Sequence, residues 1–335
     1  MAYFNHFSEP FYLAFYPDVN ASVNTPRGFI SGFEHFTRYG VNEGRTSVSP
    51  FFNEGAYLAL YPDVANAVAS GFFRSGVEHF ALSGADEGRF SPIGTFDSET
   101  TYLLKYPDVA QAVFQGAFRS GYDHFLQYGQ FEGRSPTFFN ERDYLIFNPD
   151  VAAVVGVPDP VTGVVNFNSG FEHYLTFGQF ENRVIFFTGT PGNDVVTSFG
   201  ETAVEITGVE YITLSAATNP FDYVLGSNGF GEIDTLVGGA QANIFLLALR
   251  GNQTNPNPVP LYVGGGNSDY ALIKGFERGL DTIQLIGSID NYIQQTNGVN
   301  LGIFTNTGDI VGIVEGVNTP LTTVSTSADG FFSLG

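Results

Sequence analysis

The stretch Tyr61–Arg89, YPDVANAVASGFFRSGVEHFALSGADEGR, decides the fold of the first half of the chain, because similar copies of it occur four times. Each copy contains a Pro-Asp-Val triplet, a histidine between an acidic and an aromatic residue, and a closing arginine. The closing arginines are 44, 45 and 49 residues apart. A period of this length is typical of repeat proteins, in which each unit packs on its neighbours because it cannot bury its apolar face alone.

Three polar positions recur in all four copies. The aspartates of the triplets are Asp18, Asp63, Asp108 and Asp150. The histidines are His35, His79, His124 and His173. The closing arginines are Arg45, Arg89, Arg134 and Arg183.

Each copy is predicted to form two or three short helices joined by glycine turns. Pro62 suits the first turn of a helix because it has no N–H to lose, and Asp63 favours the positive N-terminal end of a helix. Apolar residues at i, i+3 and i+4 spacing follow over 64–68 and stop before Gly71. The same spacing over 77–81 predicts a second helix.

The recurring polar residues allow a functional and a structural interpretation. Four histidines could be metal ligands, but each copy offers one histidine beside one carboxylate, whereas a closed zinc site needs about four ligands. We therefore predict half-buried histidines whose ring nitrogens bond a backbone or carboxylate group. A substrate clamp is the functional alternative for the aspartates and arginines. A charge at a helix N-terminus and an ion pair between repeats explain their recurrence better, because catalytic groups have no reason to recur four times.

Composition narrows the classes of function. The chain has 335 residues, enough for two or more domains, and its 35 Phe and 17 Tyr predict an aromatic core. The net charge of −21 leaves no basic patch for nucleic acid or an anionic lipid surface. The chain has no cysteine, which excludes disulfides, thiol chemistry and cysteine-based zinc sites.

The fold class expected is a multidomain α + β protein. Residues 1–186 are predicted to form an all-α tandem array with repeats at about 4–50, 51–95, 96–138 and 139–186. Residues 187–335 are predicted to form an all-β domain, since short β-branched segments such as VEITGVEYITL alternate there with glycine and asparagine turns. No apolar run reaches the roughly 20 residues of a membrane helix, so no transmembrane segment is expected.

Glycine-rich turns in the second domain predict calcium binding. Stretches 189–197, 229–247 and 264–287 each combine glycines with an acidic or amide residue. Calcium takes about six to eight oxygen ligands, and glycine turns can aim several carbonyls and a carboxylate at one point. We expect one or two bound ions, with a metal-free domain as the alternative.

This pattern resembles the RTX, or hemolysin-type, calcium-binding repeat GGxGxDxUx, which forms a parallel β-roll, a type of β-solenoid. The stretch beginning GTPGNDV matches well, except that Thr190 replaces the second glycine. The run ALIKGFERGLDTIQL is similar to the closing segment of serralysin-type C-terminal domains, with Gly275 in place of an aspartate. The residues that the resemblance assigns to metal binding are Gly189, Gly192, Asp194, Asp234, Asn243, Asp269 and Asp281.

The resemblance also implies an export route. RTX proteins leave the cell by type I secretion through an uncleaved C-terminal signal, and the tail SADGFFSLG is similar to such an ending. The N-terminal stretch lacks the basic and apolar regions of a Sec signal peptide. We therefore expect a secreted or cell-surface protein without an N-terminal signal peptide.

Two classes of function follow. The first is a secreted structural or adhesive protein, such as a surface-layer, fibre or matrix subunit, that self-associates and binds calcium. The alternative is an extracellular carbohydrate-binding module or hydrolase with an RTX-like tail and a cell-surface glycan as its partner. The motifs HExxH, GxSxG and the P-loop are absent, so a zinc protease has no support. Paired carboxylates of a glycoside hydrolase leave no sequence signature.

Overall fold

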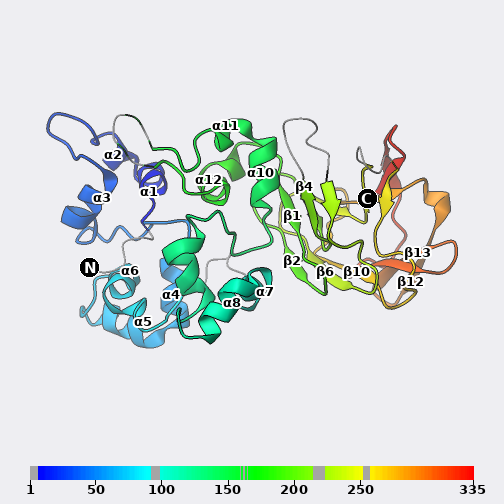
Figure 1. Cartoon of the computed structure of the whole chain (residues 1–335), viewed down its shortest axis with the longest axis horizontal. Coiled ribbons are helices and arrows are strands. Elements are labelled where there is room, and N and C mark those ends of the chain that lie inside the picture. The colour runs from blue at the N-terminus through cyan, green and yellow to red at the C-terminus, as the bar shows by residue number, and fades with distance from the viewer. Residues whose placement is uncertain are drawn as a thin grey trace. The chain divides into compact units, whose positions relative to one another are not determined.

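The computed structural model describes residues 7–91, 99–158, 160, 163, 165–213, 223–251 and 257–335 (Figure 1). The first half of the chain forms short helices that recur with the sequence repeat. The second half forms parallel and mixed sheets. This confirms the predicted change from helices to strands.

The chain separates into two compact units. The helical unit comprises the described residues up to Thr137 together with Asp150–Gly178, and the strand unit comprises Phe138–Pro149 and Gln179–Gly335. The segment at 138–140 pairs with a strand of the strand unit, since the Thr188 amide donates to the Phe138 carbonyl at 2.9 Å and the Asn140 amide to the Phe186 carbonyl at 2.9 Å. Packing therefore places this segment with the strands, although the sequence groups it with the fourth repeat.

The repeats share one order of helices, and a proline begins the second helix of each, as predicted. The first contains α1 (Glu9–Phe15), α2 (Pro17–Asn20), α3 (Gly32–His35) and η1 (Phe36–Gly40). The second contains α4 (Glu54–Leu60), α5 (Pro62–Ala69), α6 (Gly76–His79) and η2 (Phe80–Gly84). The third contains α7 (Glu99–Lys105), α8 (Pro107–Phe114), α9 (Gly121–His124) and η3 (Phe125–Gly129). The fourth contains α10 (Glu141–Phe147), α11 (Pro149–Ala152), α12 (Gly170–Thr176) and the 3₁₀ turn η4 (Gly178–Phe180).

The last helix of the first three repeats changes from α to π geometry directly after the histidine. In the second repeat the Ala85 amide donates to the Phe80 carbonyl, five residues earlier, at 3.0 Å. The turn ends at Gly84, where a Cβ atom would collide with the Tyr57 hydroxyl. Glycine is therefore required here by the close approach of a side chain.

The repeats contact one another through aromatic side chains. The Phe51 ring lies 5.1 Å from that of Phe125 and 5.9 Å from that of Phe171, so segments of three repeats meet there. The Tyr122 hydroxyl donates to the Phe51 carbonyl at 3.1 Å. Helix α1 also contacts α12, which joins the first repeat to the fourth. Contacts are therefore not limited to sequence neighbours, in contrast to the linear stack expected from the sequence.

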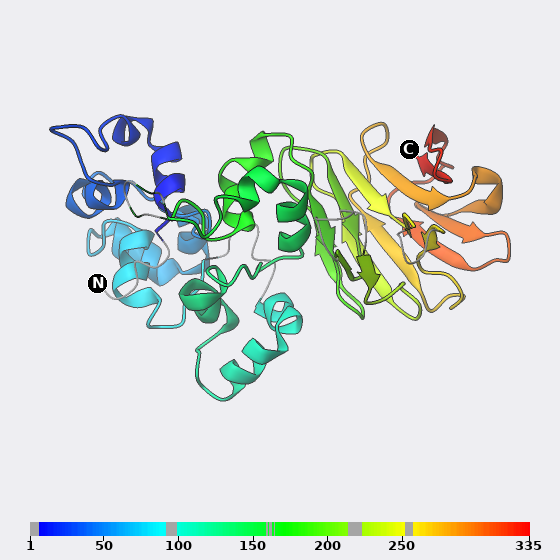
Figure 2. The same cartoon turned by 45° about the horizontal axis from the view of Figure 1, so that its top comes forward.

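The strand unit contains two six-stranded sheets among its described residues (Figure 2). The first has the order β1 (Phe186–Thr188), β3 (Val204–Thr207), β7 (Asn243–Leu246), β11 (Thr282–Ile286), β16 (Phe331–Leu334) and β15 (Thr323–Thr326). The second has the order β12 (Tyr292–Asn297), β13 (Asn300–Thr305), β14 (Ile310–Val314), β10 (Tyr270–Lys274), β6 (Ile233–Val237) and β2 (Val195–Thr197). Two short hairpins, β4 (Tyr211–Thr213) with β5 (Tyr223–Leu225) and β8 (Ala248–Leu249) with β9 (Val259–Pro260), interrupt this path.

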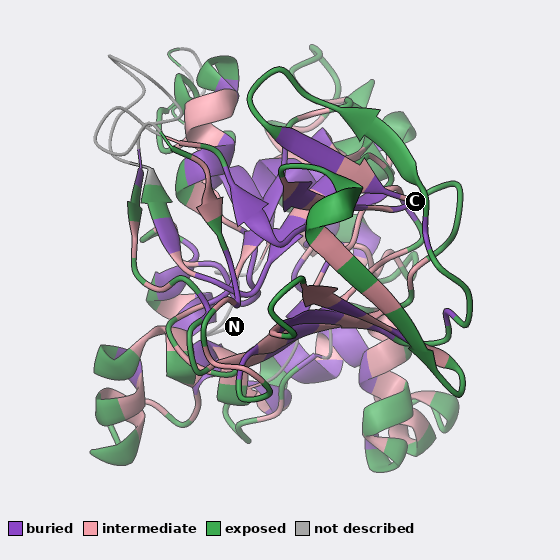
Figure 3. Ribbon diagram, turned by 90° about the vertical axis from the view of Figure 1, so that its right-hand side faces the viewer, coloured by how far each residue is buried: buried purple, intermediate pink, exposed green. Residues whose placement is uncertain are grey.

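The chain passes alternately between the two sheets from β1 to β11. Strands β1, β3, β7 and β11 pair in parallel in the first sheet, and β2, β6 and β10 pair in parallel in the second. Strands β6, β10 and β11 bury every second residue, because one face of each strand contacts the core (Figure 3). The buried side chains of these strands include Leu236, Ala271, Ile273, Ile283 and Leu285.

The close approach at the end of the π turn predicts the effect of Gly84→Ala. The new methyl group would displace the buried Tyr57 hydroxyl, so we expect the free energy of unfolding to fall by about 1–3 kcal/mol. Urea denaturation would measure it. The control is Gly55→Ala in α4, where the new Cβ would meet only ordinary contacts and alanine favours the helix. Equal stability of Gly84→Ala and the parent chain would contradict the proposed steric constraint.

Candidate functional site

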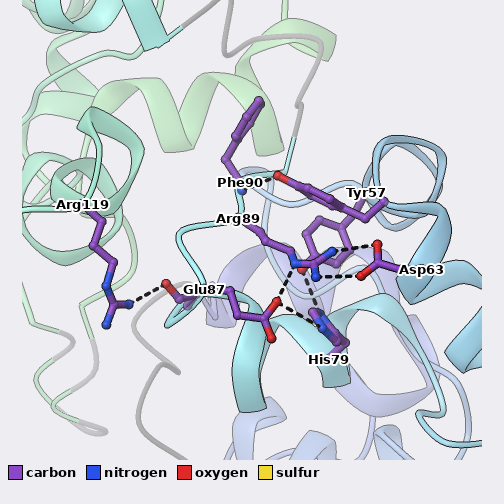
Figure 4. Close-up of polar contacts among 9 residues, drawn as sticks. Tyr57, Asp63, His79, Glu87, Arg89, Phe90 and Arg119 are labelled. Carbon is purple, nitrogen blue, oxygen red and sulfur yellow. Dashed lines mark hydrogen bonds and ion pairs between the residues drawn. The ribbon is translucent and has the colours of Figure 1, made fainter.

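The recurring residues of the second repeat form one polar network (Figure 4). The Tyr57 hydroxyl lies 2.9 Å from Nδ1 of His79, and Nε2 of His79 lies 3.8 Å from the Glu87 carboxylate. Arg89 donates to Glu87 through Nε at 2.5 Å and to both carboxylate oxygens of Asp63 at 2.7 and 2.9 Å. All five residues belong to one repeat.

The same network occurs in the first and third repeats. The tyrosine hydroxyl lies 3.0 Å from the histidine Nδ1 in both. The closing arginine again makes a bidentate bond to the aspartate of the triplet. The two networks contain Tyr12, His35, Glu43, Arg45 and Asp18, and Tyr102, His124, Glu132, Arg134 and Asp108. The ion pair therefore lies within a repeat, which corrects the prediction that it would join two repeats.

The fourth repeat departs from this arrangement. His173 is buried against the Phe167 ring, at 4.9 Å, and Asp150 lies in the first turn of α11. In the strand unit, Arg183 bonds Glu181 at 2.8 Å and the Asn148 side chain at 3.4 Å. Asn148 stands where the other repeats have a tyrosine whose ring lies beneath the arginine.

The histidines lie deeper than the half-buried position predicted, with exposed fractions of 5–6%. In the first three repeats Nδ1 of the histidine bonds a tyrosine hydroxyl, which was not predicted, and Nε2 lies 3.7–4.0 Å from a glutamate carboxylate, the kind of partner that was predicted. Burial lowers the pKa of His35, His79 and His124, and the nearby glutamates only partly oppose it. The arginine lowers the pKa of Asp63 and of Asp108 to about 2, so both aspartates stay charged. The network is thus a neutral histidine beside a permanent ion pair.

In the strand unit, Asp194 and Asp234 meet at adjacent parallel strands. Asp194 accepts hydrogen bonds from the Thr190 amide at 2.6 Å and the Thr190 hydroxyl at 2.9 Å. Asp234 accepts from the Asp194 amide at 2.8 Å and the Tyr262 hydroxyl at 2.7 Å. Burial raises the pKa of Asp234 to about 6. The nearby Gly189 donates its amide to the Thr207 carbonyl, and Gly192 has a φ of 128°.

Asn243 and Asp281 form a second pair on the other sheet. Oδ1 of Asp281 accepts from the Asn243 amide at 2.7 Å and from its side chain at 2.9 Å. The other oxygen of Asp281 accepts from the Glu277 amide at 2.8 Å. Both side chains therefore tie a turn to its neighbouring strand.

Asp269 lies apart from both pairs, beside Asp309. Oδ2 of Asp269 accepts from the Gly265 amide at 3.1 Å, while Asp309 accepts from the Gly264 amide at 2.6 Å and the Gly266 amide at 2.5 Å. Oδ1 of Asp269 is buried and makes no hydrogen bond of normal geometry to the described residues. Burial and then Asp309 raise the pKa of Asp269. Asp309 belongs to no motif and was missed by the sequence analysis.

The predicted metal-binding residues therefore divide into two pairs and one separate aspartate. Within the part of the chain that the structure describes, no three His, Cys, Asp or Glu side chains cluster closely enough to hold a metal ion. Calcium can also use carbonyl oxygens, so calcium binding stays a prediction.

A cavity of about 380 Å³ lies in the strand unit, and none of the predicted site residues lines it. Its charged lining residues are Asp143, Glu205 and Arg250, and aromatic residues form much of the wall. Burial, and more weakly Asp143, raises the pKa of Glu205 to about 7 despite the opposing charge of Arg250. The sequence analysis missed these residues because they are far apart in sequence and repeat no pattern.

No protein-family model matches the chain, and a search of curated proteins finds no significant match. Among the residues described, no helix is long and apolar enough to cross a membrane.

The lowered histidine pKa values predict loss of stability in acid. Below pH 6.5, the ordinary histidine pKa, the unfolded chain binds protons at His35, His79 and His124 that the folded chain does not bind. Their contribution to the free energy of unfolding is therefore full above pH 6.5 and is lost as the pH falls towards their folded pKa values. NMR titration of the histidine rings in the folded chain should give three values below 6.5. Values above 6.5 would contradict the burial argument.

Proposed function

We propose that the protein is a secreted structural or adhesive subunit that assembles with further copies of itself through its helical unit. The observation that carries this proposal is the number of large apolar side chains that the first three repeats expose. Among its described residues each exposes four: Phe15, Ile30, Phe33 and Tyr39; Leu60, Phe72, Leu82 and Phe90; and Leu104, Phe114, Tyr128 and Phe131. Apolar surface of this extent, especially aromatic surface, is typical of protein interfaces.

The polar residues of the repeats support the same function. In each of the first three repeats the closing arginine bonds the aspartate of the triplet, and the histidine bonds a tyrosine hydroxyl, so these polar groups already have partners within the repeat. The net charge of −21 opposes indiscriminate association, so assembly would require complementary surfaces.

The most exposed aromatic side chains provide a test of self-association. Phe72 and Phe114 are 79% and 91% exposed, and their replacement by serine leaves the core unchanged. We expect Phe72→Ser with Phe114→Ser to weaken association at least tenfold, because interface aromatics commonly contribute more than 1 kcal/mol each. Sedimentation velocity and electron microscopy would measure it.

The control for this experiment is Val299→Ser, which removes an exposed apolar side chain from the strand unit. It should assemble like the parent chain. A parent chain that stays monomeric at high concentration and binds a glycan would instead favour the carbohydrate-binding alternative.

We further propose that the strand unit is a β-roll of the RTX kind with one calcium site. The strand path that alternates between two parallel sheets supports the β-roll. The site would be the turn at Gly264–Gly266 with Asp269 and Asp309. The charge of Asp309 acts on the Asp269 carboxylate, and one buried oxygen of Asp269 makes no hydrogen bond of normal geometry to the described residues. A cation there would also relieve the repulsion between the two charges.

Thermal melting with calcium and with a chelator would test this site. Calcium at 100 times its Kd would stabilise the folded chain by about 2.7 kcal/mol and raise the Tm. Asp269→Asn should remove most of this shift, yet in chelator it should melt above the parent chain, because it removes charge repulsion. Asp290→Asn, an exposed control, should change neither value. An unchanged calcium response in Asp269→Asn would rule out this site, and no response in either chain would favour a metal-free domain.

Export by type I secretion is part of the same proposal. It is supported by the RTX-like turns and by the C-terminal tail, whose β16 pairs with β11 of the first sheet. Folding outside the cell would then be coupled to calcium, since the ion binds only the folded turn.

A further inference from the structure

The cavity in the strand unit lies on one face of the first sheet. Phe186 of β1 and Glu205 of β3 are paired in register, and Leu246 of β7 is paired with Gln284 of β11, so these four side chains share that face. Helix α10 and the residues near the two hairpins supply the other walls.

The elements that supply the lining residues indicate a binding site rather than a packing defect. The hairpin β4–β5 interrupts the path between β3 and β6, and β8–β9 interrupts it between β7 and β10. The alternation of strands between the sheets does not require either hairpin. Nevertheless Tyr211 and Tyr223 of the first and Leu249 of the second line the same cavity.

Four of the lining residues are aromatic. The ring centroids of Phe147 and Phe186 are 5.2 Å apart, those of Phe186 and Tyr211 are 6.4 Å apart, and those of Tyr211 and Tyr223 are 5.7 Å apart. The four rings thus form a continuous wall. Aromatic rings attract cations through the negative charge on their faces, and this attraction is strongest where water is excluded.

The charged groups of the cavity have an acidic excess. Asp143 and Glu205 oppose one arginine, Arg250. Burial, and then the charge of Asp143, raises the pKa of the Tyr211 hydroxyl. The Glu205 amide donates to the Ile185 carbonyl, but among the described residues no hydrogen bond to the Glu205 carboxylate is found, so this carboxylate can accept from a donor in the cavity. A carboxylate in such surroundings is satisfied best by a cationic N–H group, since charge-assisted hydrogen bonds are the strongest.

We propose that this cavity binds a small organic ammonium ion, a protonated amine on an apolar body. The ammonium group would bond Glu205, and the apolar body would lie against the aromatic wall. The volume of about 380 Å³ suits such a ligand, since small-molecule sites begin at roughly 300 Å³. The raised pKa of Glu205 is consistent with this proposal, because Arg250 alone does not offset the burial of the two acids.

Calorimetry on the full chain, with benzylamine as the probe, would test the proposal. Its neutral isostere, benzyl alcohol, has the same ring and lacks the charge, and glucose tests the sugar alternative. At pH 8 we expect benzylamine to bind roughly tenfold to hundredfold more tightly than benzyl alcohol, the factor of a hydrogen bond to a charged group. Benzylamine binding should weaken from pH 8 to pH 6, because Glu205 takes up a proton over this range. The other ionisable groups that line the cavity are Asp143, Arg250, Tyr211 and Tyr223.

Two matched variants distinguish this cavity from the rest of the acidic surface. Glu205→Gln keeps the shape and removes the charge, so benzylamine binding should weaken roughly tenfold or more while benzyl alcohol binding stays the same. Glu201→Gln, an exposed control in the same unit, should bind like the parent chain. Both should remain folded, and Glu205→Gln should melt no lower than the parent chain because it removes a buried charge.

Three results would overturn the proposal. Benzyl alcohol could bind as tightly as benzylamine, which would make the cavity a simple apolar site. Glucose could bind while the amine does not, which would favour the carbohydrate alternative. Finally, benzylamine at millimolar concentration could fail to bind a folded parent chain, or could bind Glu205→Gln equally well.

Discussion

The structure depends on carboxylates that accept hydrogen bonds from the backbone amides of tight turns. In the second repeat, Glu54 accepts from the Gly76 and Val77 amides at 2.6 and 2.9 Å, and so covers the N-terminus of α6. Helix α6 has four residues and too few internal hydrogen bonds to stand alone. Glu9 and Glu99 do the same for the first and third repeats.

In the strand unit, too, carboxylates accept hydrogen bonds from turn amides that have no partner in the sheets. Its strands are two to six residues long, so a large share of its backbone lies in turns that the sheets cannot satisfy. Asp281 accepts from the amide four residues before it, and Asp194 and Asp269 do the same. The acidic composition of the chain therefore has a structural cause in both units, because short elements have many ends and each end needs an acceptor.

The fold was predictable where one residue determines local geometry. Pro62 begins α5, glycines end the helices, and β-branched segments from Phe187 onward form strands. Sequence spacing could not show the π turn, because an α-helix and a π turn have the same apolar pattern over five residues. The turn ends at Gly84, where the Tyr57 hydroxyl approaches from a helix more than twenty residues earlier, and no local pattern announces that approach.

The candidate sites were predictable only where their residues recur in the sequence. The recurring histidines and arginines were identified by their period. Their partners lie in the same repeat. A sequence period is the same whether a residue bonds a partner in its own repeat or in the next one, so it could not predict those partners. The cavity has no period at all. Its acids come from α10 and β3, and a single sequence carries no signal that these elements lie together.

The RTX-like motif illustrates how one residue pattern can serve two physical purposes. A glycine turn followed by an aspartate can surround a calcium ion, and it can also direct turn amides at the carboxylate, which then serves as their acceptor. Asp194 and Asp281 each accept a turn amide on one oxygen, and their other oxygen accepts from the Thr190 hydroxyl and the Asn243 amide, respectively. A metal ion at either position would have to compete with these bonds. Asp269 is different, because one of its oxygens is buried without a hydrogen bond of normal geometry and Asp309 adds a second negative charge beside it. The energetic argument for a cation is therefore stronger at Asp269 than at Asp194, although the sequence around Asp194 matches the motif more closely. A buried carboxylate oxygen without a good hydrogen bond and a second negative charge beside it both favour a cation.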